Sequence, residues 1–249
     1  MDEQTNARFQ TAKEKIIGVT RQRRGIGTLS EKTVHAVLKY FYAPDEDMHE
    51  IPIGNYVADI YTGQEIIEIQ TRSFNAMRPK LNCFLQDYPV TVVYPIPHCK
   101  WISWIDETTG ECSLKRKSPL TGNAYFAFPE LYKLKMFLKN ENLRFRFVLL
   151  DLEEYRLLNG WSRDKKKGSC RFDRIPTRIV DEIIIERRED YMQFVPLSLD
   201  RFTSMQFAKA AHIRKPLAQT TLNILFELGI VKRIGKQGNS YLYETEEIS

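Results

Sequence analysis

Residues 55–72, NYVADIYTGQEIIEIQTR, constrain the fold more than any other part of this chain. Two short runs rich in β-branched and aromatic residues flank Thr62-Gly63-Gln64. This arrangement is typical of two strands joined by a tight turn. We therefore expect a β-hairpin here, and the rest of the fold has to be built around it.

Acidic residues fall at fixed positions on this predicted hairpin. Because side chains alternate along a strand, Glu68 and Gln70 share one face of the second strand, and Asp59 lies on the first strand. If Asp59 and Glu68 meet across the hairpin, two carboxylates converge, as a hard divalent cation requires. The pattern predicts a site for Mg²⁺ or Mn²⁺ at Asp59 and Glu68, with Gln70 pointing into the same space.

The spacing of these residues resembles the PD-(D/E)XK nuclease superfamily. Its signature is an Asp that ends one strand, a variable gap, and Glu-X-Lys on the next strand. Here Asp59 is followed by an eight-residue gap and then by Glu68-Ile69-Gln70, with Gln70 in place of the Lys. Some active members are similar in carrying Gln there. The resemblance implies a Mg²⁺-dependent deoxyribonuclease in which Asp59, Glu68 and Gln70 are catalytic.

The order of predicted elements agrees with this resemblance. An apolar stripe predicts a helix over 33–42, and 49–53 reads as a strand leading into the hairpin. A further helix is expected after Ser73, and a short buried strand at 90–94, ended by prolines. Helix, hairpin, strand, helix and strand is the core order of the restriction-endonuclease-like fold. We expect an α/β protein with such a mixed central sheet flanked by helices.

Further polar residues are candidates for the same site. Glu31, His35 and Lys39 form a stripe on the first predicted helix, which is either a solvated face or, as the resemblance implies, a polar row that reaches the active site. Glu50 is either an additional metal ligand or an edge-strand residue that faces water. Because Gln70 carries no charge, Lys39 or Lys100 would have to stabilise charge that develops on the phosphate.

The remaining segments of the first 195 residues are less distinctive. We expect 1–28 to be a basic N-terminal arm or helix, either touching phosphates or simply packing on the nuclease domain of 29–195. Within the domain of 29–195, the pattern predicts a buried strand at 145–150 and a short helix at 153–158. The pattern of 178–191 does not distinguish helix from strand.

The last segment, 196–249, changes character. Two predicted helices, 202–211 and 215–228, precede a hairpin at 230–243, an order that resembles the winged-helix family. Residues 201–243 hold seven Lys or Arg and one acidic residue, a net charge of +6 against +5 for the whole chain. This excess favours binding of nucleic acid over a pure protein-contact role. The residues expected to contact DNA are Arg72, Lys100, Lys215, Gln219, Thr220, Asn223, Lys232 and Lys236.

Composition excludes several other classes of protein. With 43% hydrophobic and 28% charged residues the chain is typical of a globular protein, and its cysteines show no CxxC spacing for a zinc ribbon. No segment is apolar enough to span a membrane, so we expect a cytoplasmic protein without membrane contact.

Three functions are compatible with these patterns. The first is a metal-dependent nuclease that cuts duplex DNA, either as a monomer or as a homodimer. The second is a DNA-binding protein whose nuclease-like fold has lost catalysis. The third is a transcription regulator in which the winged helix reads DNA and the large domain senses a ligand.

Overall fold

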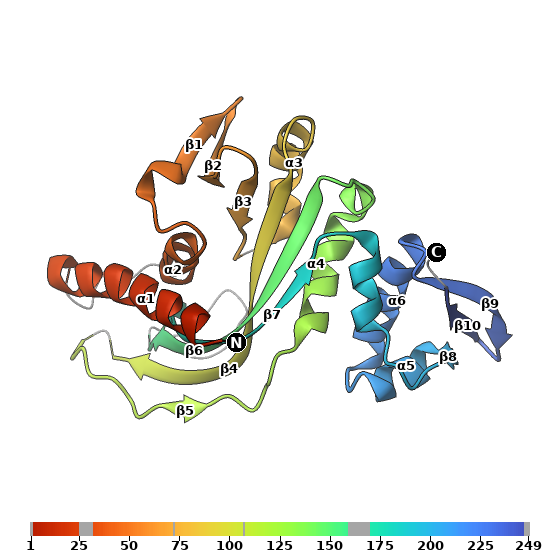
Figure 1. Ribbon diagram of the computed structural model, residues 1–249. Coiled ribbons are helices and arrows are strands. Elements are labelled where there is room, and N and C mark those ends of the chain that lie inside the picture. The colour runs from red at the N-terminus through yellow and green to blue at the C-terminus, as the bar shows by residue number, and fades with distance from the viewer. Residues whose placement is uncertain (1, 25–31, 72, 107, 159–169, 247–249) are drawn as a thin grey trace.

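The computed structural model describes residues 2–24, 32–71, 73–106, 108–158 and 170–246. It is a mixed α/β structure in which helices flank a large mixed sheet, and a small three-stranded sheet lies near the C-terminus (Figure 1). The large sheet has seven strands in the order β1-β2-β3-β4-β6-β7, and β5 pairs with β4. Its strands are β1 His49–Ile53, β2 Tyr56–Tyr61, β3 Ile66–Ile69, β4 Val90–Ile105, β5 Arg116–Lys117, β6 Leu143–Leu157 and β7 Cys170–Ile185.

The predicted hairpin is present. β2 and β3 are antiparallel, with Ile60 opposite Ile67, and Gly63 in the turn has a φ of +87°, which a residue without a Cβ adopts at no steric cost. β3 then runs parallel to β4, and β4 parallel to β6, whereas β7 returns antiparallel. The sheet is therefore mixed, and β3 lies between an antiparallel and a parallel neighbour.

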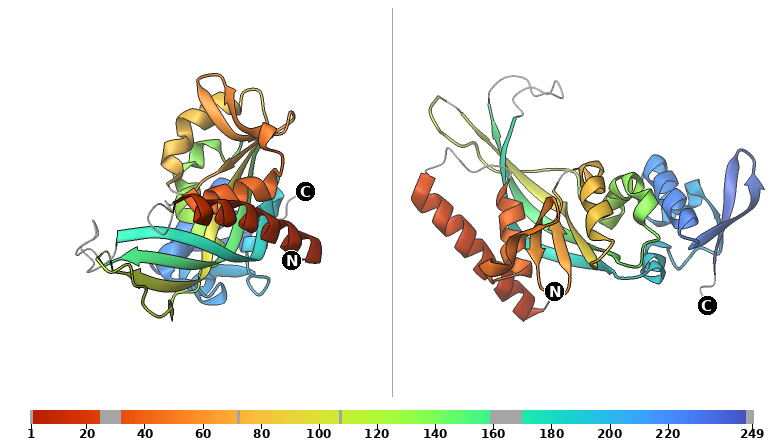
Figure 2. Two further views of the ribbon diagram at one scale, coloured as in Figure 1. Left: turned by 90° about the vertical axis from the view of Figure 1, so that its left-hand side faces the viewer. Right: turned by 90° about the horizontal axis from the view of Figure 1, so that it is seen from above.

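Each face of the sheet is covered by a different set of helices. On one face, α1 (Glu3–Arg24) and α2 (Lys32–Tyr42) bury Phe9 and Leu38 against alternate residues of the strands, such as Ile67. On the other face, α3 (Arg78–Phe84) and α4 (Phe128–Lys133) close a second apolar cluster. The two views of Figure 2 show α1 beside the long strands, so the predicted N-terminal helix does pack on the domain. The described residues also include the short 3-10 helices Glu46–Met48, Phe74–Met77, Ala124–Ala127, Lys135–Phe137 and Arg188–Phe194.

Proline sets the start of α3. The helix expected after Ser73 begins with the 3-10 turn Phe74–Met77, and α3 itself starts at Arg78 with Pro79 in its first turn. Proline fits there because the first turn of a helix has no intrahelical partner for an N–H group.

The expectation of a short strand ended by prolines was wrong. β4 continues through Pro95 and Pro97 to Ile105, paired with β6 along this length except for a register shift after Pro97. The carbonyl of Val93 accepts a hydrogen bond from the Gln70 N–H, so it faces the β3 side. The two-residue period of a strand turns Pro95 and Pro97 to the same side, where β3 has already ended at Ile69. Their missing N–H groups are therefore not needed.

The short helix expected at 153–158 was also wrong, because β6 runs on to Leu157. Its outer part pairs with Cys170–Pro176 of β7, and this cross-strand pairing overrides the local helical pattern. The undecided segment 178–191 is strand up to Ile185 and then a 3-10 helix.

The C-terminal part contains the expected helices and hairpin. Its elements are β8 Arg201–Thr203, α5 Ser204–Ala210, α6 Lys215–Glu227, β9 Val231–Gln237 and β10 Ser240–Thr245. Thr203 caps α5 through the N–H of Gln206, and Gly229, with a φ of +67°, follows the end of α6. The small sheet has the order β8-β10-β9, so β10 is central. Buried residues of this part belong to the same apolar cluster as those of α3 and α4.

Among the described residues, no helix is long and apolar enough to cross a membrane.

Candidate active site

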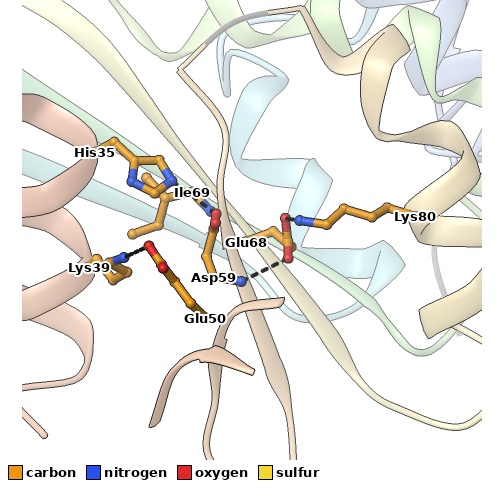
Figure 3. A network of polar contacts seen from close by, with 7 residues as sticks. All are labelled: His35, Lys39, Glu50, Asp59, Glu68, Ile69 and Lys80. Atoms are coloured by element: carbon orange, nitrogen blue, oxygen red, sulfur yellow. Dashed lines mark hydrogen bonds and ion pairs between the residues drawn. The ribbon is translucent and has the colours of Figure 1, made fainter. Parts of the chain in front are cut away.

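Two carboxylates converge across the β2–β3 hairpin. The register places Asp59 opposite Glu68, and the backbone N–H of Asp59 donates to Glu68 Oε1 at 3.1 Å. In return, the N–H of Ile69 donates to Asp59 Oδ2 at 2.8 Å (Figure 3). Each side chain is thus fixed by the backbone of the opposite strand, which holds both carboxylates near the C-terminal end of β3.

Each carboxylate also has a cationic or ionisable partner from a helix. His35 Nε2 of α2 lies 3.1 Å from Asp59 Oδ2, and Lys80 Nζ of α3 lies 2.6 Å from Glu68 Oε2. Since α2 and α3 cover opposite faces of the sheet, the two partners approach the hairpin from opposite sides (Figure 3).

Lys80 is the functional candidate that sequence reasoning missed. The PD-(D/E)XK signature has a Lys two residues after its Glu, where this chain has Gln70. The structure instead brings a Lys from the following helix, twelve residues beyond Glu68. The only sequence signal was its place on the expected helix beside the hairpin, because a contact between separate elements leaves no spacing pattern.

The two carboxyl groups differ in proton affinity. Burial and the nearby charge of Asp59 raise the pKa of Glu68 to about 7, although Lys80 acts in the opposite direction. Burial would also raise the pKa of Asp59, but the hydrogen bond and charge of His35 and the N–H of Ile69 hold it below its usual value. When two carboxyl groups share a site, their pKa values typically move apart in this way, because both cannot be charged at low cost. At neutral pH, Asp59 is therefore ionised while Glu68 exchanges a proton readily.

These groups open into a small cleft of about 220 Å³. Gln70 lines the same cleft, as predicted from its parity with Glu68, and its side-chain Nε2 donates to the carbonyl of Ser73 at 3.3 Å. The residues lining the cleft are His35, Asp59, Glu68, Ile69, Gln70, Thr71, Ala76, Met77 and Lys80.

Lys39 and Glu50, which were also predicted to be catalytic, do not line the cleft but lie beside Asp59 and His35 (Figure 3). Lys39 Nζ donates to Glu50 Oε1 at 2.8 Å, and this ion pair lowers the pKa of Glu50. The Glu50 side chain is 71% exposed on the edge strand β1, so its carboxylate is largely in water. Glu31 and Arg72 lie outside the described residues.

The predicted DNA-binding residues are dispersed. Lys100 lies on β4, 3.6 Å from the buried Glu154. Lys215 and Gln219 are exposed on α6, whereas Thr220 and Asn223 are half-buried. In the β9–β10 hairpin, Lys232 pairs with Glu244 at 3.2 Å, and Lys236 is exposed near the ring of Tyr241.

A second group of potential metal ligands, His98, Cys99 and Asp151, lies where β4 and β6 change register. However, Asp151 already accepts hydrogen bonds from the His98 ring, the Cys99 N–H and, twice, from Arg178. A carboxylate has about four acceptor directions, so a metal ion would have to displace one of these donors. We therefore interpret the group as a structural tie between strands.

A larger hollow lies elsewhere, with a volume of about 770 Å³, between α6, residues 138–143 and residues 185–191. It contains none of the predicted site residues, and its lining carries charges of both signs. The hydrogen-bonded carboxylates in the smaller cleft are a stronger indication of chemistry than volume alone.

Comparison with known proteins gives two findings. Residues 32–186 match the family described as "Domain of unknown function (DUF8091)", and the chain belongs to this family. The chain is also 28% identical over 162 residues to a Treponema pallidum (strain Nichols) protein described as "Uncharacterized protein"; the match covers 65% of this chain and 61% of that protein. The chain therefore spans about three fifths of that relative's length. No solved structure gives a significant match.

Proposed function

We propose that this member of the DUF8091 family is a metal-dependent nuclease that hydrolyses phosphodiester bonds in DNA. The observation that carries the proposal is the convergence of Asp59 and Glu68 across the hairpin, in a cleft that Gln70 and Lys80 also line. The strand order around the hairpin supports a restriction-endonuclease-like core.

The donor set fits a hard divalent cation such as Mg²⁺ or Mn²⁺. Both residues offer carboxylate oxygens, and the hydrogen bonds described above use two acceptor directions on each. When bound, such a cation polarises the scissile phosphate and lowers the pKa of an attacking water.

The residues that line the cleft have distinct roles in this proposal. Asp59 and Glu68 bind the cation, and His35 orients Asp59 through its ring nitrogen. Lys80 supplies a positive charge close to Glu68, the contribution for which Lys39 or Lys100 had been expected because Gln70 is uncharged. Gln70 orients the water or a phosphate oxygen through its amide.

The C-terminal part supports nucleic acid as the substrate. Two helices and a hairpin follow the order of a winged helix, and α6 would be its recognition helix. Exposed Lys215 and Gln219 on α6 and Lys236 in the hairpin would contact DNA.

One observation favours a second function, that of a DNA-binding protein or transcription regulator without catalysis. Asp59, Glu68 and Glu50 each already face a basic residue, namely His35, Lys80 and Lys39. Because each of these carboxylates already has a basic partner, the site needs no metal ion to balance its negative charge.

The test is cleavage of a labelled DNA duplex with Mg²⁺, with Mn²⁺ and with a chelator. Asp59→Asn and Glu68→Gln should each lower the rate by about 10²- to 10³-fold, since loss of several kcal/mol of transition-state stabilisation has this effect. Asp181→Asn, which changes an exposed carboxylate on β7, is the matched control and should cut at the wild-type rate.

Cleavage by Asp59→Asn or Glu68→Gln at the wild-type rate would overturn the assignment. Duplex binding without any metal-dependent cleavage by the wild-type chain would favour the second function. A parallel RNA substrate tests the choice of DNA.

A further inference from the structure

Four basic side chains converge on one buried carboxylate in the outer part of the large sheet. Glu154 of β6 has a fully buried side chain. Its carboxylate accepts from Arg156 Nε at 2.7 Å and Arg174 Nε at 2.9 Å, and it lies 3.6 Å from Lys100 Nζ and 3.9 Å from Arg171 Nε. The four cations come from three adjacent strands, β4, β6 and β7.

This cluster has more positive charge than the glutamate neutralises. One carboxylate compensates only one of the three cations Lys100, Arg156 and Arg174, and a guanidinium has five N–H donors in a fixed fork. Arg156 directs two of its donors, and Arg174 one, at Glu154. The side chains stay partly exposed, from 17% for Lys100 to 40% for Arg171. Consistent with excess positive charge, burial and the charges of Arg174 and Arg156 lower the pKa of Lys100.

The cluster lies on strands that continue past the candidate active site. β3 ends at Ile69 opposite Val93, whereas β4 and β6 extend beyond this point with β7 (Figure 1). Lys100 is seven residues beyond Val93 on β4, roughly 20 Å at the rise of a strand. A polyanion lying across the cleft and along these strands would reach the cluster.

We propose that Lys100, Arg156, Arg171 and Arg174 form a phosphate-binding surface for the nucleic acid that is cut at Asp59 and Glu68. This inference rests on the proposed function. Glu154 is a positioning residue that orders the cations before the ligand arrives, which reduces the entropy lost on binding. The contacted phosphates lie about six base pairs from the reacting one, given the roughly 20 Å separation and the rise of a DNA duplex.

The first experiment measures binding of a fluorescent duplex of about 30 base pairs across a range of salt concentrations, in the presence of a chelator. The variant is Arg156→Gln with Arg174→Gln. The matched control is Lys135→Gln with Lys139→Gln, which removes the same charge at two lysines that pair with Glu227. The slope of log K against log salt should fall by about 1.8 in the variant and stay unchanged in the control.

Equal slopes for the variant and the wild type would overturn the inference. Because the double variant removes partners of a buried carboxylate, circular dichroism and a thermal melt must show that it is folded. If it is not, Lys100→Gln serves instead, since Lys100 is farther from Glu154 than Arg156 is, and its slope should fall by about 0.9.

A cleavage assay on the same duplex keeps the two hypotheses distinguishable. Wild-type cleavage that is lost in Asp59→Asn, together with an unchanged slope in the arginine variant, would overturn the phosphate-binding surface alone. A reduced slope without any cleavage would overturn the nuclease and leave this surface as a nucleic-acid contact.

Discussion

Glu68 and Glu154 are both buried glutamates, with 4% and 0% of their surface exposed, yet the fold treats their charges in opposite ways. Burial and the charge of Asp59 raise the pKa of Glu68 to about 7. Burial acts in the same direction on Glu154, but Arg174, Lys100 and Arg156 lower its pKa to about 2. The neighbouring charges, and not burial alone, decide whether a buried carboxyl group is ionised.

The comparison assigns the two glutamates different tasks. Glu68 shares a small cleft with a second carboxylate and one lysine. Its carboxyl group can therefore be protonated, paired with Lys80 or bound to a cation, with small differences in free energy between these states. Glu154 is a permanent anion that fixes cations from three strands. The first arrangement is suited to chemistry, and the second to presenting charge.

The largest expected effect is a difference in the stability of the folded protein between the Glu154→Gln and Glu68→Gln variants. Glu154→Gln leaves its basic partners without a counter-charge, so we expect the free energy of unfolding to fall by about 3–5 kcal/mol. Glu68→Gln keeps an acceptor for the Asp59 N–H and removes a carboxylate whose ionisation is disfavoured by burial and by Asp59, so no fall in the free energy of unfolding is expected near neutral pH. Urea unfolding measures both, and equal losses would show that the two sites do not differ.

Glu154 and Glu68 should contribute to the pH dependence of the free energy of unfolding with opposite signs. For Glu154 the folded pKa of about 2 lies below the ordinary 4.5, so its stabilisation is complete above pH 4.5 and is lost as the pH falls through 2. For Glu68 the folded pKa of about 7 lies above 4.5, so its contribution is complete below pH 4.5 and is lost as the pH rises through 7.

Thermal melts from about pH 2 to about pH 8, a range that contains both pKa values, test this difference. The Glu68→Gln variant should lose less stability than the wild type on the neutral side, and an unchanged profile there would contradict the raised pKa.

The third expectation concerns metal binding, which the proposed function requires. A proton and a cation compete for Glu68, so the Kd for Mn²⁺ should fall by roughly tenfold between pH 6 and pH 8. Calorimetric titration of the wild type and of Asp181→Asn should give the same dependence. Affinity that does not vary with pH would place the cation away from Glu68.

The smallest effect is expected at Glu50. Its ion pair with Lys39 is largely exposed on the glutamate side, so Glu50→Gln should change the free energy of unfolding by less than about 1 kcal/mol. The same variant tests the predicted role of Glu50 as a metal ligand. A loss of Mn²⁺ affinity of about tenfold or more would support that role.

The hairpin was predictable because its signals are local. Strand alternation and the turn at Gly63 depend on neighbours in sequence, and they placed Asp59, Glu68 and Gln70 at one cleft. Lys80 and Glu154 were not predictable, since their partners come from other elements. The length of β4 was missed for a related reason: a proline ends a strand only where its neighbour needs an N–H, and the sequence alone does not reveal where β3 ends.

The two prolines of β4 have a further consequence. Beyond the end of β3, residues 94–97 of β4 have no strand partner on that edge among the described residues, and at His98 the N–H of Gly122 donates to the β4 carbonyl. Such an edge is ordinarily a template on which another chain adds a strand and begins to aggregate. Pro95 and Pro97 offer no N–H to an incoming strand, so this edge of β4 resists self-association.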